Sequence, residues 1–261
     1  MTDWTPYSLP SGGPSKLQCV TTWRGDSAGS YPLQAYWAGT DGTLWRSSTD
    51  PHSGFIQMYT DTTAVTRMAV DDRDTVYGID SSGKPVQYGD DGWTSLDLGD
   101  NTERLVAIDV AVAVKDDTVW FVMREGQYYV HGPNTTLEGS LSLPLKAVAP
   151  MKAPDPSHPN SVGEAWGVIG WGGLAYSDGG SWLFKNGDAS MISDVVDVST
   201  SVNYAWLLKT DGSVWATQTG FTGERVGTTF TAKSICGGKG DYCYAVATDG
   251  TPWRTTDPNP L

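Results

Sequence analysis

Short runs of apolar, aromatic and β-branched residues alternate along the whole chain with turns rich in Gly, Asp, Ser and Pro. Examples of such runs are residues 67–70, 105–108 and 195–198. Runs of this length between turn residues are typical of β-strands. No stretch of ten or more residues combines the periodicity of a helix with its capping residues. The pattern therefore predicts an all-β fold.

A glycine-marked turn recurs along the chain every 38 to 46 residues. The turn glycines are Gly42, Gly83, Gly126, Gly172, Gly212 and Gly250. An aromatic residue precedes each glycine by six positions: Tyr36, Tyr77, Trp120, Trp166, Trp206 and Tyr244. Because aromatic residues make up only 11% of the chain, six matches at one offset indicate an internal repeat. This aromatic position is called −6 below, and the other positions of a repeat are counted from the same glycine.

Each repeat has room for four short strands. Positions −6 and −4 lie on one face of a strand, since side chains alternate along it. The glycine supplies the turn of a hairpin, and the next strand carries position +3. With one run before this hairpin and one after it, the repeat matches a propeller blade. The sequence therefore predicts a single domain, residues 1–261, that forms a six-bladed β-propeller of four-stranded antiparallel blades.

The two ends of the chain are predicted to share one blade. The last repeat ends within five residues of Thr256 and has no room for a fourth strand. Residues 4–9 (WTPYSL) resemble residues 93–98 (WTSLDL), the fourth strand of the second repeat. We therefore expect the N-terminal strand to close the ring, since the sixth blade would otherwise keep an open edge. The predicted blades are 14–60, 61–102, 103–144, 145–190, 191–231 and 232–256, the last completed by residues 2–10.

The charge of the chain restricts its partners. A formal net charge of −13 disfavours nucleic acid and anionic membrane surfaces, which need a basic face. The N-terminus lacks the basic and apolar regions of a secretory signal, and no apolar run is long enough to insert into a membrane. Three cysteines form no disulfide framework. We therefore expect a cytoplasmic protein. Its release by a route that needs no signal peptide is an open alternative.

The second repeat carries a resemblance to a known family. It reads VYGIDSSGKPVQY over residues 76–88, and Trp93 begins its next strand. This resembles the tectonin repeat, roughly V-W-G-(V/I)-N-x-x-G-x-(I/V)-Y with a Trp leading the following strand. Residues 165–168 and 204–208 are looser copies. The resemblance implies a six-bladed lectin that recognises cell-surface glycans, including O-methylated sugars and bacterial or fungal saccharides. It also implies a role in innate defence.

Aromatic residues at three offsets are candidates for sugar contacts, because a pyranose stacks its C–H face on an aromatic ring. We expect the −6 aromatics to pack between blades. Tryptophans at +3, two of them followed by an arginine that can donate to hydroxyls, and tryptophans that begin a fourth strand are ligand candidates. These residues are Trp45, Arg46, Trp215, Trp253, Arg254, Trp93, Trp182 and Trp4. Packing remains the alternative for each of them. Trp37, Phe121 and Trp171 fit none of these offsets.

No catalytic or metal-binding residues stand out. The acidic runs 71–74 and 90–92 lack the spacing of a calcium loop, and the three histidines lie far apart. No cofactor is expected. The sequence therefore favours a non-enzymatic, multivalent carbohydrate-binding lectin. The alternatives are a protein-interaction propeller without sugar binding and, less favoured, a propeller glycosidase, which would need two positioned carboxylates. A homo-oligomer is left open.

Overall fold

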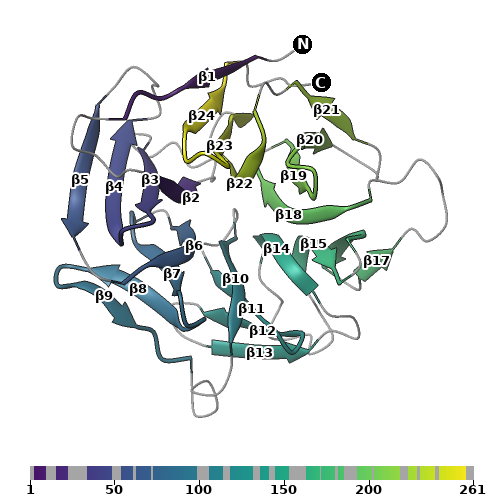
Figure 1. Ribbon diagram of the computed structural model, residues 1–261. Coiled ribbons are helices and arrows are strands. Elements are labelled where there is room, and N and C mark those ends of the chain that lie inside the picture. The colour runs from purple at the N-terminus through teal and green to yellow at the C-terminus, as the bar shows by residue number, and fades with distance from the viewer. Residues whose placement is uncertain are drawn as a thin grey trace.

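The computed structural model describes residues 3–9, 16–22, 34–48, 54–60, 63–71, 73–98, 106–113, 118–131, 136–140, 145–152, 163–170, 172–179, 182–184, 193–201, 203–217, 223–227, 230–238 and 241–256. These residues form six antiparallel sheets of four strands, which surround a central axis as the blades of a ring (Figure 1). The predicted six-bladed propeller is confirmed.

The strands follow one another from the axis to the rim in each blade. Blade one consists of β2 (Leu17–Thr22), β3 (Gln34–Gly39), β4 (Thr43–Ser48) and β5 (Phe55–Thr60). Blade two consists of β6 (Val65–Val70), β7 (Val76–Asp80), β8 (Pro85–Gly89) and β9 (Gly92–Ser95). Blade three consists of β10 (Ala107–Val112), β11 (Val119–Met123), β12 (Gln127–His131) and β13 (Thr136–Ser140).

The second half of the ring repeats this order. Blade four consists of β14 (Leu145–Lys152), β15 (Gly163–Ile169), β16 (Leu174–Gly179) and β17 (Trp182–Phe184). Blade five consists of β18 (Val195–Thr200), β19 (Ala205–Lys209), β20 (Val214–Thr217) and β21 (Glu224–Val226). Blade six consists of β22 (Ala232–Gly237), β23 (Cys243–Ala247), β24 (Pro252–Thr255) and the N-terminal β1 (Trp4–Pro6).

The N-terminal strand closes the ring as predicted. β1 pairs antiparallel with β24, with Trp4 opposite Thr255 and Pro6 opposite Trp253. The backbone N–H of Tyr7 then donates to the Pro252 carbonyl at 2.9 Å, just as the N–H of Leu96 donates to the Pro85 carbonyl in blade two. Residues 4–9 therefore hold the same place in blade six as residues 93–98 hold in blade two. Figure 1 shows both ends of the chain beside this blade.

The blades pack face to face through six separate apolar clusters. Each cluster contains one of the six −6 aromatics, which lie between their own blade and the following one. All six are at most 8% exposed, so their predicted packing role is confirmed. The +3 side chains belong to the opposite face and pack toward the preceding blade, as Tyr129 and Trp45 do. One interface thus joins a −6 aromatic of one blade to a +3 residue of the next.

The repeated glycine links neighbouring blades through its backbone. All six turn glycines have positive φ, between 76° and 91°, a conformation that favours glycine. The carbonyl of Gly83 accepts the N–H of Ala107 at 2.8 Å, and that of Gly212 accepts the N–H of Ala232 at 2.9 Å. A Cβ atom on either glycine would collide with the next blade. The turn therefore needs glycine for its φ angle and for this close approach.

We expect Tyr7→Ala to destabilise the ring, because Tyr7 anchors the closing segment. Tyr7 is 3% exposed and packs edge-on against Trp37 of blade one at 5.2 Å between ring centroids. Loss of a buried aromatic ring costs about 3–5 kcal/mol. Urea unfolding of Tyr7→Ala measures this cost. Ser8→Ala, at an exposed position, is the control and should change stability by less than about 0.5 kcal/mol. Equal effects of the two variants would contradict closure by this segment.

Candidate functional site

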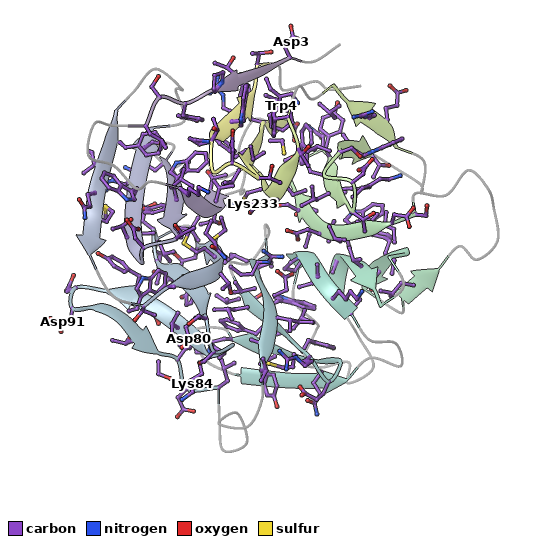
Figure 2. The ribbon with its side chains drawn as sticks, in the orientation of Figure 1. Asp3, Trp4, Asp80, Lys84, Asp91 and Lys233 are labelled. Atoms are coloured by element: carbon purple, nitrogen blue, oxygen red, sulfur yellow. The ribbon has the colours of Figure 1, made fainter. Side chains whose placement is uncertain are left out.

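The inner strands surround a cavity on the ring axis. Each inner strand has a β-bulge at the same place in its register, between Val65 and Arg67 in blade two for example. The residue after the bulge is Cys19, Arg67, Asp109, Ala147, Asp197 or Ser234. In Figure 2 the bulge residue Lys233 lies near the axis, whereas Asp91 lies at the rim. The cavity offers about 30 Å³ to the centres of water molecules. That is room for one or two ordered waters, and a sugar does not fit.

A guanidinium group and two carboxyl groups meet in this cavity. Arg67 Nε lies 3.8 Å from Asp109 Oδ1, and Asp109 Oδ2 accepts the backbone N–H of Val148 at 2.7 Å. Burial and the nearby charge of Asp197 raise the pKa of Asp109 to about 8. The charge of Asp197 also raises the pKa of Arg67. These contacts connect blades two to five across the axis, so the cluster ties the ring together at its centre.

A short polar relay fixes two of the candidate tryptophans. Asp41 Oδ1 accepts the Thr43 hydroxyl at 2.6 Å, and Thr43 Oγ1 accepts the indole N–H of Trp45 at 2.7 Å. The same relay joins Asp211, Ser213 and Trp215 in blade five, with distances of 2.6 and 2.9 Å. The sequence D-G-(T/S)-x-W encodes it, because alternate residues of a strand share a face. Both indole N–H groups are therefore already used inside the protein.

The structure separates the predicted sugar contacts Trp45 and Arg46 onto opposite faces of β4. Trp45 is only 6% exposed and lies in the cluster between blades six and one. Arg46 points to the opposite face of β4, where it contacts Tyr36. Successive side chains of a strand leave on opposite faces, so the two cannot contact one ligand. Trp45 is a packing residue.

The other two +3 tryptophans are half-buried. Trp215 packs between blades four and five, and Lys209 Nζ lies 4.2 Å from the centroid of its ring. Trp253 stacks on Phe230 at 4.6 Å, between blades five and six. Its neighbour Arg254 again takes the opposite face, 4.6 Å from the ring of Tyr242. The Trp253–Arg254 pair is therefore split between two faces in the same way as the first pair, and sugar contact by either residue stays a prediction.

Trp253 also lacks the last step of the relay. Asp249 Oδ1 accepts the Thr251 N–H at 2.8 Å. Within the described part of the chain, however, the buried Nε1 of Trp253 has no hydrogen-bond partner, and neither has the buried Nε1 of Trp4. These two indoles lie at the same interface, between blades five and six. Both keep an unused donor there.

The tryptophans that begin a fourth strand occupy one equivalent position. Trp93 is opposite Tyr88, Trp182 opposite Ser177 and Trp4 opposite Thr255, and each of these partners is at position +5. Trp93 and Trp4 are half-buried and pack toward the preceding blade. Figure 2 shows Trp4 on the last blade, away from the axis. The side chain of Trp182 lies outside the described residues. The structure thus places these three candidates at alternate blades, two, four and six.

Position −5 decides where such a tryptophan fits. It carries Gly78, Gly167 and Ala245 in blades two, four and six, and Trp37, Phe121 and Leu207 in blades one, three and five. A Cβ atom on Gly78 would stand 3.2 Å from Cζ3 of Trp93 and 2.7 Å from Cγ1 of Val65. A small −5 residue therefore makes room for the tryptophan of the fourth strand. Trp37 and Phe121, irregular in the sequence, are the large alternatives and are fully buried. Trp171 lies outside the described residues.

A shallow depression lies beside Trp93, between blades one and two. It contains about 150 Å³ of empty space, partly open to solvent, with no room for an enclosed water molecule. Its lining residues are Ala38, Gly39, Gly42, Thr43, Leu44, Thr63, Val65 and Trp93. Trp93 is held edge-on by Tyr88 at 5.4 Å. A ligand would rest over this depression against the indole. Sequence reasoning found Trp93 but missed Thr63, which stands in an irregular connection.

The described residues contain no cluster of three or more His, Cys, Asp or Glu side chains arranged to hold a metal ion. Among the same residues, no helix could span a membrane.

Comparison with known proteins shows the fold. No protein-family model matches the chain, and no curated protein matches it in sequence. A Xanthomonas campestris gluconolactonase has a TM-score of 0.66 at 11% identity, covering 97% of this chain and 89% of its own. The WD40 propeller domain of Doa1 has a TM-score of 0.62 at 9% identity, covering 98% of this chain and 97% of its own. Virginiamycin B lyase from Staphylococcus aureus has a TM-score of 0.61 at 9% identity, covering 98% of this chain and 99% of its own. At these identities the similarity extends to the propeller fold alone.

The polar relay predicts unequal effects for two similar substitutions. Thr43→Val leaves the buried indole N–H of Trp45 without an acceptor, which costs about 1–3 kcal/mol. Thr251→Val is the matched control in blade six, because Trp253 does not donate to Thr251. Both variants lose a contact to the turn aspartate, so their difference in urea unfolding isolates the indole hydrogen bond. No difference would mean that Trp45 is held by packing only.

The cluster of Arg67, Asp109 and Asp197 in the axial cavity predicts a pH dependence of stability. The folded pKa of Asp109, about 8, lies above its unfolded value of about 3.8. The folded state therefore binds an extra proton between these values, and its stability falls as the pH rises through this range. Asp109→Asn keeps an acceptor for Val148 and removes the titration. From pH 5 to pH 8, its melting temperature should rise by a few degrees relative to wild type.

The control for this titration is Asp91→Asn in the exposed turn between β8 and β9. Its melting temperature should follow that of wild type at both pH values. A gain for Asp109→Asn that is the same at pH 5 and pH 8 would contradict the titration of this carboxyl group.

Proposed function

We propose that this protein is a non-catalytic, carbohydrate-binding propeller that recognises cell-surface glycans through tryptophans at the blade interfaces, with Trp93 as the principal contact. The observation that carries the proposal is the half-buried Trp93 beside a shallow, partly open depression. The resemblance of the second repeat to tectonin repeats supports the same function, since Trp93 belongs to that repeat.

The surroundings of Trp93 suit a sugar. An indole offers an apolar face to the C–H groups of a pyranose. The walls formed by Ala38, Leu44 and Val65 are apolar, and Thr63 and the backbone of the turn at Gly42 add polar groups. Such a combination of an aromatic platform, a small apolar surface and a few polar groups is typical of ligand sites. The apolar walls also suit a methyl substituent, so O-methylated saccharides belong to the proposed ligand class.

The axial cavity does not suit catalysis on a glycan. Asp109 and Asp197 are the two carboxylates that its inner surface brings near each other, and both are at most 7% exposed. A glycosidase needs its carboxylates on either side of a bound sugar, whereas this cavity accommodates only one or two waters. The proposal therefore includes no catalytic residue.

The distribution of exposed apolar side chains favours small sites over a broad docking surface. Among the described residues, the large hydrophobic side chains that are exposed are Ile56 at 57% and Val196 at 39%. They belong to blades one and five, so they do not form one contiguous patch of the kind that protein partners cover. Individual sugar sites of this size bind weakly, and several on one ring gain affinity on a glycan-coated surface.

Glycan-array screening followed by calorimetric titration tests the proposal. We expect binding of at least one saccharide, and Trp93→Ala should weaken it at least tenfold, or about 1.4 kcal/mol. Trp215→Phe is the control, because the indole of Trp215 is already occupied by Ser213 and Lys209. Its affinity should stay within about twofold of wild type, which is under 0.5 kcal/mol. No binding to any glycan, with a protein captured in pull-downs, would favour the docking alternative instead.

A further inference from the structure

We propose that the residue two positions before the inner strand decides which blade interface binds a saccharide. Thr63 leaves the interface of blades one and two open, whereas Phe230 closes the interface of blades five and six. This inference rests on the proposed glycan-binding function and assigns it to one of the two interfaces at which the structure describes the side chain of a tryptophan that begins a fourth strand.

Thr63 and Phe230 occupy equivalent places. Thr63 precedes Val65, the first residue of β6, and Phe230 precedes Ala232, the first residue of β22. Val65 and Ala232 have the same register, each lying just before the bulge. Each interface also receives the tryptophan of a fourth strand, Trp93 in one case and Trp4 in the other. The two interfaces are therefore built on one plan and differ at this position.

Phe230 covers the aromatic groups that a sugar would use. Its ring stacks on Trp253 at 4.6 Å with an interplanar angle of 12°, and it meets Trp4 at 5.2 Å and 88°. One side chain thus occupies a face of Trp253 and contacts the ring of Trp4. At the other interface the smaller Thr63 lines the depression beside Trp93. A threonine therefore leaves open the space that a phenylalanine ring fills.

The closed interface nevertheless contains unused donors. Within the described residues, the buried Nε1 atoms of Trp4 and Trp253 have no partner. Buried polar groups normally have a hydrogen-bond partner. Saccharide hydroxyls can accept such bonds, so this interface without the phenylalanine ring would offer a saccharide two indole rings whose N–H groups lack a partner. We infer that Phe230→Thr creates a second saccharide site and that Thr63→Phe removes the first.

Indole NMR signals locate the ligand on the protein. The experiment titrates the ¹⁵N-labelled full chain with methyl glycosides of mannose, galactose and fucose and with their 2-O-methyl derivatives. Signals are assigned with Trp93→Phe and Trp4→Phe. In wild type we expect shifts of the Trp93 indole and none of the Trp4 indole. Thr63→Phe should weaken binding at Trp93 at least tenfold, and Phe230→Thr should add saturable shifts at Trp4.

Two milder substitutions test the same inference in case Thr63→Phe or Phe230→Thr fails to fold. Thr63→Leu should weaken binding at Trp93, and Phe230→Val should produce shifts at Trp4, with melting temperatures within a few degrees of wild type. Ligand-dependent shifts at Trp4 in wild type, or unchanged binding in both Thr63 variants, would overturn the inference while glycan binding stands. No indole shift with any glycoside would overturn both the inference and the proposed function for these sugars.

Discussion

Closure of the ring is the constraint on which the other interactions depend. Each sheet buries both faces against its neighbours, so six sheets form six interfaces only if the last meets the first. The chain satisfies this by placing β1 in the final sheet, where Trp4 faces blade five and the following Tyr7 faces blade one. The closing segment therefore supports two interfaces at once. The charge cluster at the axis adds a second connection between blades, through Arg67, Asp109 and Asp197.

The two faces of each blade differ in how far their residues vary from repeat to repeat. The −6 aromatics are buried at every interface, so they are common to all blades. The opposite face varies. Where position −5 is small, as at Gly78, a tryptophan of the outer strand extends over it and stays partly exposed. Where position −5 is large, as at Trp37, that residue fills the interface itself. A small residue at position −5 therefore occurs in alternate blades, two, four and six, although the repeat occurs in every blade.

The sequence predicted the fold well because the fold depends on periodic features. The turn glycines, the −6 aromatics and the likeness of residues 4–9 to residues 93–98 are all visible without coordinates. The pairing of Trp45 with Arg46 was predicted from their adjacency in the sequence, whereas side chains alternate along a strand and place the two on opposite faces. Trp45 is held through Thr43 to Asp41. The D-G-(T/S)-x-W spacing that allows this relay is visible in three repeats, but the indole hydrogen bond forms in two of them, at Trp45 and Trp215.

Other parts of the site have no periodic signal. Phe230 and Thr63 stand in irregular connections, and their equivalence becomes visible only through the register of the inner strands. The cluster in the axial cavity combines single residues from separate repeats, since the position after the bulge carries Asp in blades three and five and Cys, Arg, Ala or Ser in the other four. Differences of this kind depend on how the blades meet in space. A repeat alignment alone shows that the positions vary and does not show which ones share a cavity.

The pairing of β1 with β24 also fixes the response of the protein to mechanical load. Trp4 lies opposite Thr255, and the chain enters and leaves at this same end of the ladder, where Thr256 donates to the Asp3 carbonyl at 2.8 Å. A force that pulls the two termini apart would break these hydrogen bonds one after another, starting from the end of the ladder that carries both termini. The three residue pairs of β1 and β24 would yield before any blade is sheared. Tethering by both termini therefore opens the ring between β1 and β24, whereas anchorage through a single terminus places no load on this pair of strands.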